Sequence, residues 1–263
     1  VLFVCPLVSG SHEEHRRISN CAVARNNHQN RMRSPPNTYP HLLQIVHRRR
    51  INGISMLRVC GGAILSEHVG LTAAHCLMGE PREFEVYSDA QSISRGKKHR
   101  ISKIFPHYLF NESDYYSPDL AIFTLANGIH LGPRARPICL PPDISHVLPG
   151  TIMEIAGWGI EYEGDTTMLL RNHKLEKQNL YTCQNYYKDF HPAYSFCVGQ
   201  VGDPDICEGD SGSPLWTAER GVHVVHGLVS SSFEGKQCGM RQGPSLCTRV
   251  ANFRTWILNI VRL

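Results

Sequence analysis

The sequence lacks an apolar run of the roughly 20 residues that a membrane-spanning helix needs. Residues 1–10 are uncharged and mostly apolar, but a polar stretch over residues 11–17 follows at once. This pattern predicts the remnant of a secretory signal peptide over 1–10, with Val8 and Gly10 offering small-residue cleavage positions, rather than a buried N-terminal strand. We therefore expect a secreted, extracellular protein without a membrane span.

The sequence also lacks the spacings typical of metal sites. Its ten cysteines include no Cys-x₂-Cys pair, and its 15 histidines include no His-Glu-x-x-His motif. Both patterns mark zinc-binding proteins. We expect no metal, no cofactor, and histidines mostly at the surface. In a secreted chain the cysteines predict disulfides instead. If Cys5 leaves with the signal, nine cysteines allow at most four bridges and one leftover thiol.

Charge is modest, and this excludes a disordered chain. Charged residues make up 19% and hydrophobic residues 41% of 263 positions, which is typical of folded proteins with one large core or two smaller ones. The net charge of +4 includes basic clusters at 48–50 and 95–100. Such clusters are most typical of solvated surface loops; the alternative is a surface that binds a polyanion such as heparin, without specific nucleic-acid recognition.

The organisation along the chain indicates an all-β domain. Residues 11–38 are polar, basic and rich in Asn and Pro, without periodicity, which predicts a pro-segment with the activation region. After it, short β-branched and aromatic runs alternate with turn residues and predict a sandwich or barrel. Helical spacing of apolar residues over 250–261 predicts a C-terminal helix. The predicted strands include 42–46, 62–65, 84–87, 120–125, 151–156, 222–229 and 246–250.

Residues 204–213 contain the strongest chemical signal. Ser211 lies in the run Glu-Gly-Asp-Ser-Gly, with glycine at 209 and 212. Such glycines let the backbone bend sharply, expose the serine Oγ and leave room for two N–H groups to point at one spot. This arrangement suits acyl transfer, in which a hydroxyl attacks a carbonyl and the resulting oxyanion needs donors.

Two other segments supply partners for this serine. His75 lies between small residues and a cysteine in 71–76, and Asp119 opens an apolar run after Ser-Pro in 117–122. The order His, Asp, Ser differs from the Ser, acid, His order of α/β-hydrolases. The Ser, acid, His order fails here. Only His223 and His226 follow Ser211, and Glu219 lies too close to them in sequence for the acid and the histidine to belong to separate structural elements.

With these segments, and with Cys-Gly-Gly at 60–62, Gly-Trp-Gly at 157–159 and Thr-Arg-Val at 248–250, the chain resembles the trypsin/chymotrypsin family of serine proteases from about Tyr39 onward. The resemblance implies a protease domain over 39–263. Its two antiparallel six-stranded β-barrels would divide near residue 140, with the active site between them and a C-terminal helix on the second barrel.

The resemblance also implies roles for individual residues. Ser211 is the expected nucleophile, His75 the general base and then acid, and Asp119 the group that orients His75. The N–H groups of Gly209 and Ser211 would form the oxyanion hole. The implied activity is endopeptidase hydrolysis of peptide bonds through an acyl-enzyme.

Substrate preference follows from the same resemblance. Asp205 stands where the family has the base of its primary specificity pocket, and a buried carboxylate there predicts cleavage after Lys or Arg. Ser230, Ser232 and Ser245 are the other expected substrate-binding residues. Ser232 and Ser245 replace glycines, which narrows the slot, and Ser231 replaces a tryptophan.

Four disulfides are implied by resemblance. One of them, between Cys21 and Cys139, would tether the pro-segment to the protease domain. Cys247 stands where the family usually has an aromatic residue, and the sequence leaves open whether it is a thiol or bridges to Cys5. Asn111-Glu112-Ser113 is an expected glycosylation site, at Asn111. The implied pairs are Cys60–Cys76, Cys183–Cys197, Cys207–Cys238 and Cys21–Cys139.

Activation leaves two functions open. Family zymogens are cut before Ile-Val-Gly-Gly, and the new ammonium pairs with the acid before the nucleophile, here Asp210. This chain has no Ile-Val-Gly-Gly, and Ser213 replaces a glycine nearby. Cleavage after Arg25, Arg31 or Arg33 would give other termini, of which Asn26 lies nearest the expected place. The chain is then either a zymogen-derived enzyme, with peptide substrates, an activating protease and protein inhibitors, or a non-catalytic homologue that binds or regulates partners.

Overall fold

The computed structural model describes residues 32–33, 38–51, 54–114, 116–142, 147–160, 168–199, 206–231 and 243–261. Several expectations fall outside these residues. They concern the signal remnant 1–10, most of the pro-segment, and the residues Cys5, Cys21, Arg25, Asn26, Arg31, Asp205, Ser232 and Cys238.

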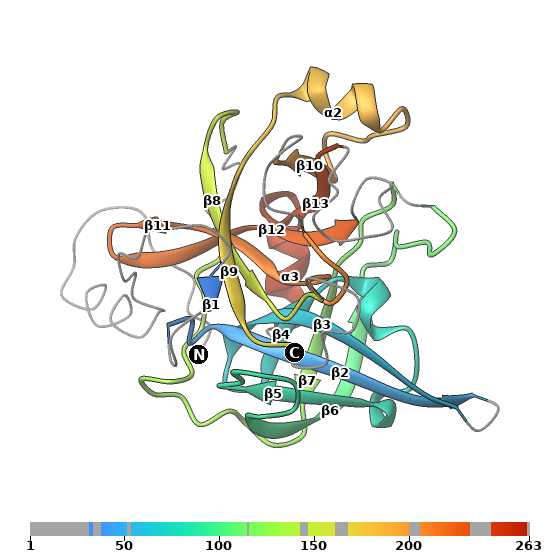
Figure 1. The fold of residues 1–263 in the computed structure, drawn as a ribbon, viewed down its shortest axis with the longest axis vertical. Helices are drawn as coiled ribbons and strands as arrows, with labels where there is room; N and C mark the ends of the chain where they lie inside the picture. The colour runs from blue at the N-terminus through green and yellow to red at the C-terminus, as the bar shows by residue number, and fades with distance from the viewer. Residues whose placement is uncertain are drawn as a thin grey trace.

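The first half of the chain forms a closed antiparallel barrel with the strand order β2-β3-β4-β7-β6-β5 (Figure 1). Its interior is filled by large apolar side chains such as Leu43, Ile45, Ile64 and Phe123. Gly70 is needed on β4, since a Cβ there would lie 2.2 Å from the Phe123 ring. The strands are β2 (Leu42–Ile51), β3 (Ile54–Ser66), β4 (Val69–Thr72), β5 (Phe84–Ser88), β6 (Lys97–Pro106) and β7 (Ala121–Leu125).

The second half forms a sheet with the order β1-β9-β8-β11-β12-β13-β10. A bridge between Lys177 and Val198 joins the end of β9 to β10, which closes these six longer strands into a second barrel. β1 is an added strand at the β9 edge. The strands are β1 (Met32–Arg33), β8 (Ile152–Gly157), β9 (Arg171–Glu176), β10 (Ser195–Val198), β11 (Pro214–Glu219), β12 (Val222–Ser231) and β13 (Ser245–Arg249).

A shared core joins the two barrels. One apolar cluster contains Leu71 and Ile122 of the first barrel together with Ala156, Trp216 and Leu228 of the second. His41, which precedes β2, lies against both Trp216 and His223, with ring centroids 4.6 and 5.0 Å apart. The two halves are therefore packed on each other rather than linked only by the chain.

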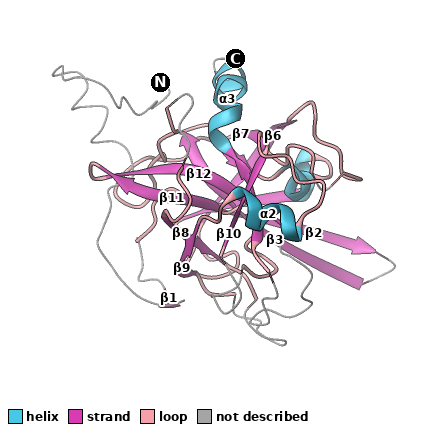
Figure 2. Ribbon diagram, turned by 90° about the horizontal axis from the view of Figure 1, so that it is seen from above, coloured by secondary structure: helices cyan, strands magenta, loops and turns pink. Residues whose placement is uncertain are grey.

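The helices in the described part of the chain are short (Figure 2). The 3₁₀ helix η3 (Val250–Phe253) runs into α3 (Arg254–Val261), which confirms the C-terminal helix. Its Phe253 and Trp256 rings lie 4.9 Å from His107 of the first barrel, so the helix also contacts that half. α2 (Leu180–Tyr186) is capped at its N-terminus by Asn179, whose side chain accepts from Thr182 N. No helix among the described residues is long and apolar enough to cross a membrane.

The all-β, two-barrel fold is confirmed, but several strands escaped sequence analysis. β6 and β9 have the sequences KKHRISKIFP and RNHKLE, which are too polar to predict a strand. They form because each lies between two neighbouring strands that satisfy its backbone hydrogen bonds. β1 lies inside the stretch predicted as pro-segment, and its Met32 pairs with Asn172 of β9.

Candidate active site

His75 is held in place by the chain on both sides. It lies in the short 3₁₀ helix η1 (Ala74–Leu77), which follows β4. The next residue, Cys76, forms a disulfide with Cys60 of β3. Thr72 Oγ1 donates to Gly61 O at 2.7 Å and ties the end of β4 to the same strand. These bonds fix the backbone beneath the imidazole, whose side chain is 30% exposed.

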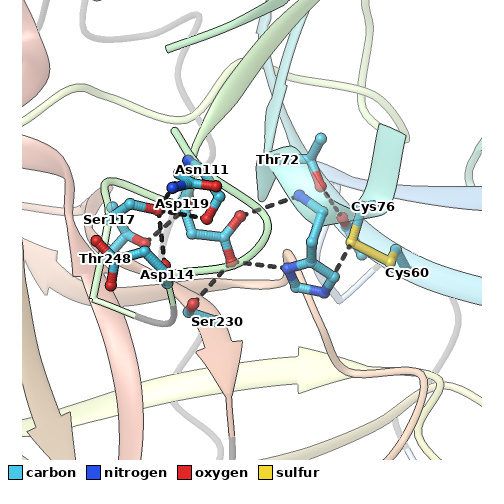
Figure 3. A network of polar contacts seen from close by, with 11 residues as sticks. Cys60, Thr72, Cys76, Asn111, Asp114, Ser117, Asp119, Ser230 and Thr248 are labelled. Atoms are coloured by element: carbon cyan, nitrogen blue, oxygen red, sulfur yellow. Dashed lines mark hydrogen bonds and ion pairs between the residues drawn. A yellow bond between two sulfur atoms is a disulfide. The ribbon is translucent and has the colours of Figure 1, made fainter. Parts of the chain in front are cut away.

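Asp119 lies in the loop before β7 and meets His75 twice. Its Oδ1 accepts from the His75 backbone N at 3.0 Å, and Oδ2 lies 2.7 Å from His75 Nδ1. Two residues of the second barrel complete its surroundings (Figure 3): Ser230 Oγ donates to Oδ2 at 2.7 Å, and Thr248 Oγ1 donates to the Asp119 carbonyl at 2.8 Å. With the proton on Nδ1, the imidazole keeps Nε2 as an acceptor.

The electrostatics of Asp119 reflect two opposed effects. Burial raises the pKa of its carboxyl, because desolvation disfavours the charge. Hydrogen bonds from His75 and Ser230 and the attraction of the imidazole outweigh that effect and lower the pKa below its ordinary value. The group is therefore an anion at neutral pH, suited to holding a histidine that gains a proton.

Ser211 lies in a turn built around glycines. Gly209 and Gly212 have φ of +100° and +74°, which residues with a Cβ rarely adopt. Gly61 N donates to Ser211 O at 2.7 Å, and a Cβ at Gly212 would lie 2.2 Å from Thr72 Oγ1. The turn can therefore pack against the histidine segment only because position 212 has no side chain.

His75, Ser211 and Gly209 line one cavity of about 400 Å³. No hydrogen bond joins Ser211 to His75 in the described part of the chain; Cys76 Sγ lies 3.7 Å from His75 Nε2. Hydrogen bonds of this kind are often loose without substrate. The structure thus brings all three residues to one site, with the final serine–histidine contact unmade.

The peptide between Glu208 and Gly209 is held by a backbone hydrogen bond from the loop after β8. The carbonyl of Glu208 accepts from Ile160 N at 2.8 Å and so points toward Ile160. In a trans peptide the following N–H points the opposite way, so Gly209 N–H faces away from Ile160. Gly209 and Ser211 both line the cavity, and an oxyanion hole formed by their N–H groups stays a prediction.

Asp210 is almost completely buried beside this turn. Its Oδ1 accepts from Gly159 N at 2.8 Å and its Oδ2 from Cys207 N at 2.9 Å. A Cβ at Gly157 or Gly159 would lie 2.3 or 2.4 Å from the carboxylate. The Gly-Trp-Gly motif therefore leaves the space that this acid occupies.

The predicted specificity residues are only partly visible. The Ser230 hydroxyl donates to Asp119, and substrate binding at Ser230 stays a prediction. Ser245 is buried on β13 opposite Val198 of β10. Ser231 ends β12 and is half-buried. Asp205 and Ser232 lie outside the described residues, and the Lys or Arg preference stays a prediction.

Two of the expected disulfides, Cys60–Cys76 and Cys183–Cys197, are present. Cys207 is also disulfide-bonded, and its expected partner lies outside the described residues. Cys139 and Cys247 are both buried; the expected partner of Cys139, Cys21, is not described either. Cys60, His75 and Cys76 lie close enough to suggest a metal site. The sulfurs of the two cysteines are joined in a disulfide, however, and are not thiolate ligands.

Sequence reasoning missed several members of this site. Ser230 was expected to bind substrate, yet its side chain supports Asp119. Thr248 belongs to a motif used to recognise the family, but its contact with Asp119 joins residues 129 positions apart. Glu208 and Ile160 orient the Gly209 peptide through backbone atoms alone, and no side-chain pattern signals such a role.

The Trypsin family model matches residues 30–257, and the chain therefore belongs to the trypsin family of serine proteases. It is 31% identical over 230 residues to serine protease 56 of Homo sapiens, covering 85% of this chain and 37% of that protein. Serine proteinase stubble of Drosophila melanogaster is 30% identical over 236 residues, covering 82% and 29%.

A third relative, CLIP domain-containing serine protease B15 of Anopheles gambiae, is 28% identical over 224 residues, covering 77% of this chain and 61% of that protein. The chain thus spans less than two thirds of the length of each of these relatives.

Proposed function

We propose that this domain is a secreted serine endopeptidase that cleaves peptide bonds after Lys or Arg through an acyl-enzyme. The observation that carries the proposal is the 2.7 Å contact between His75 Nδ1 and Asp119 Oδ2, with Ser211 lining the same cavity as that imidazole. The three residues stand in the order and the roles that acyl transfer needs.

The mechanism follows from these positions. Ser211 Oγ attacks the substrate carbonyl carbon while His75 Nε2 takes its proton, and Asp119 stabilises the resulting imidazolium. Negative charge on the carbonyl oxygen is met by the N–H groups of Gly209 and Ser211; loss of one such donor typically costs about 100- to 1000-fold in rate. His75 then protonates the leaving amine. Water, activated by the same imidazole, hydrolyses the ester on Ser211.

Activation is proposed to occur at Arg25. A new terminus must reach Asp210 while β1 stays paired with β9. Cleavage after Arg33 removes both residues of β1, and cleavage after Arg31 puts the terminus at Met32, where β1 begins. Cleavage after Arg25 leaves residues 26–31 to make the connection. A terminal Asn26 buries less apolar area than Ile, which makes the active state less favoured.

The Lys or Arg preference is proposed from Asp205, with Ser230, Ser232 and Ser245 along the pocket. A cation meeting a buried carboxylate offsets the cost of desolvating it. The test compares Lys and Arg peptides on the parent protein and on Asp205→Ser. Unchanged turnover by the variant would remove Asp205 from this role.

Secretion and glycosylation belong to the same proposal. The disulfides are typical of oxidising compartments. Asn111 is exposed in a turn in which its Oδ1 accepts from Ser113 N at 3.1 Å, so the acceptor side chain is reachable. Digestion of the secreted protein with a glycosidase, compared with Asn111→Gln, would reveal an attached glycan as a loss of mass.

Polyanion binding is proposed for the first barrel, because the two basic clusters meet there. Arg48 of β2 and Lys98 of β6 both contact Glu85 of β5, the strand between them. Because the single carboxylate of Glu85 faces the two cations of Arg48 and Lys98, this group of three side chains keeps a net positive charge. The parent protein and Lys98→Gln would each be eluted from a heparin column with a salt gradient. Elution of the variant at a lower salt concentration than the parent would support this surface as the binding site.

A non-catalytic binding protein is the second candidate. The absence of Ile-Val-Gly-Gly and the unmade hydrogen bond between His75 and Ser211 favour it. In that case Asp210 would not gain the ammonium that stabilises the active arrangement, and the same scaffold would bind partners without cleaving them.

The deciding experiment is fluorophosphonate labelling of the secreted protein before and after limited trypsin treatment, with the new N-terminus sequenced. Labelling that appears after cleavage and is absent from Ser211→Ala and His75→Ala supports the endopeptidase. Ser66→Ala, a change on β3 outside the site, is the matched control and should label normally. Clean cleavage without labelling would favour the binding protein.

A further inference from the structure

A cluster of three polar side chains lies on the hairpin of β11 and β12 (Figure 1), outside the active site. Thr217 and Glu219 belong to β11, and His226 belongs to β12. Thr217 Oγ1 donates to Glu219 Oε1 at 2.7 Å and lies 2.7 Å from His226 Nε2. The same nitrogen lies 3.1 Å from Glu219 Oε1. A hydroxyl, a carboxylate and an imidazole nitrogen therefore form a closed triangle with sides of similar length.

The local backbone explains why these side chains meet. Thr217 and Glu219 are two residues apart on one strand, so their side chains share a face of the sheet. The pairing of β11 with β12 shifts between Leu215 and Trp216, which leaves His226 as the extra residue of a β-bulge. A bulge redirects the side chain that it carries. The bulge thus brings the imidazole to the carboxylate and the hydroxyl.

The hairpin that carries the cluster is held on both sides. Its turn consists of Arg220 and Gly221, whose φ angles of +48° and +82° are those of a tight two-residue turn. β11 also pairs with β8, where Trp216 lies opposite Glu154. The three polar atoms are therefore positioned by the fold, and a ligand would not have to order them.

The lone pairs of the three groups converge on one place. The hydrogen bond with His226 lowers the pKa of Glu219 and, with the other favourable contacts, outweighs the opposite effect of burial, so the carboxylate is an anion at neutral pH. Thr217 contributes a hydroxyl oxygen with lone pairs of its own. His226 Nδ1 is buried without a hydrogen-bond partner among the described residues, so Nε2 is the ring atom that meets the other two groups. Two oxygens and one nitrogen, with one negative charge, are a donor set for a cation.

The spacing of the three atoms matches one face of an octahedral metal site. With metal–ligand bonds of about 2.1 Å, neighbouring ligands of an octahedron lie about 3.0 Å apart. An imidazole ligand favours a first-row transition metal, whereas Ca²⁺ prefers six to eight oxygens. The Glu219 side chain is 33% exposed and Thr217 is half-buried, so water would reach the ion and complete its coordination.

We propose that Thr217, Glu219 and His226 bind one divalent transition-metal ion, which ties β11 to β12 at the surface of the second barrel. Sequence analysis predicted no metal because it searched for the spacings of zinc motifs. These three ligands include a threonine and follow none of those spacings. The site does not depend on the proposed endopeptidase activity.

The first test is calorimetric titration of ZnCl₂ into the full chain, prepared without a histidine tag. Zn²⁺ is the probe because nitrogen and oxygen sites bind it more tightly than Mn²⁺ or Fe²⁺. Loss of even a partner of a metal ligand typically costs about 10- to 100-fold in metal affinity, so His226→Gln and Glu219→Gln should each weaken binding at least about 10-fold. Excess CaCl₂ should not displace the ion. No saturable binding, or equal affinity in the parent and both variants, would overturn the proposal.

Two controls separate this site from the other histidines. His68 Nε2 lies 4.0 Å from Glu67 Oε1 with both side chains exposed, so His68→Gln changes a histidine–glutamate pair without the threonine and the bulge. His75→Ala removes the imidazole of the active site. Both variants should bind Zn²⁺ with the affinity of the parent. Binding that is lost in His75→Ala and kept in His226→Gln would assign the ion to the active site and contradict the proposal.

A second measurement keeps the test valid if the buried His226 does not tolerate substitution. Zn²⁺ should raise the midpoint of thermal unfolding of the parent, because the ion binds the native chain. The rise should disappear in Glu219→Gln and shrink in Thr217→Val, which change partly exposed side chains. A rise of equal size in the parent and in Glu219→Gln would contradict the site. None of these readouts uses catalysis, so a parent that fails to label with fluorophosphonate but binds Zn²⁺ here contradicts only the proposed function.

Discussion

The hydroxyl of Ser230, at the end of β12, donates a 2.7 Å hydrogen bond to Asp119 Oδ2 across 111 residues of sequence. The bond crosses from the second barrel to the first, and its acceptor is the same oxygen that meets His75 Nδ1. The orientation of His75 therefore depends on how the two barrels are packed, not only on the barrel that carries the histidine.

Ser230→Ala should weaken the site without dismantling it. Hydrogen bonds to charged groups contribute about 1.5–3 kcal/mol, so we expect a loss of that order in the free energy of unfolding and a several-fold fall in kcat. Urea unfolding and turnover of the activated protein measure the two effects. Ser66→Ala should change neither, and a Ser230 variant with parental kcat would mean that the bond does not position Asp119.

Acidification should destabilise the packing between the barrels. His41 Nδ1 lies 3.3 Å from His223 Nδ1, and both rings are buried. Burial lowers the pKa of His41 well below 6.5 and that of His223 to about 4. Both groups therefore bind protons more readily when unfolded, so stability is full above pH 6.5 and declines as the pH falls toward 4. For His223 alone the loss between pH 7 and pH 4 is on the order of 3 kcal/mol.

Urea unfolding at a series of pH values measures this slope. His223→Gln should flatten the slope between pH 6.5 and pH 4, while His68→Gln, which changes an exposed histidine, should not. Protonation of Asp119, whose pKa lies below its ordinary value, adds a further loss only at lower pH. A parent protein equally stable at pH 7 and pH 4.5 would contradict the prediction.

Loss of the Cys60–Cys76 disulfide should cost both stability and activity. The bridge closes a segment of 16 residues, for which a loss of about 3 kcal/mol is typical. It also anchors the residue next to His75, so kcat should fall more than KM rises. The Cys60→Ala/Cys76→Ala double variant would be compared with the parent by guanidinium unfolding and by turnover. The Cys183→Ala/Cys197→Ala pair, which lies away from His75, should lose stability with a smaller effect on kcat.

The site of activation should be Arg25. Arg25→Gln should block the appearance of fluorophosphonate labelling after trypsin treatment, and Arg31→Gln should leave it intact. The physical reason is that β1 begins at Met32 and must stay paired with β9 when the terminus reaches Asp210. Labelled protein whose sequenced terminus is Met32 or Ser34 would show that this strand is dispensable.

Much of the two barrels was predictable because their buried strands are apolar runs in the sequence. Runs such as those in β2, β7 and β12 are apolar enough that burial alone indicates a strand. β6 and β9 could not be found this way, since their polar residues gain strand geometry only from neighbouring strands. β1 was hidden in a polar stretch for the same reason, and its two residues pair with β9 inside the stretch predicted as pro-segment.

The candidate reacting groups could be recognised from one sequence: a serine among glycines, a histidine beside a cysteine, an acid before an apolar run, and their order along the chain. Those are local chemical facts, readable residue by residue. What supports these groups appears only in the folded chain: Ser230 and Thr248 reach Asp119 from the other barrel through single hydrogen bonds, and Glu208 and Ile160 are joined within the second half through backbone atoms. Contacts between residues more than a hundred positions apart, or between backbone atoms alone, leave no pattern in one sequence. These contacts form only when the chain folds.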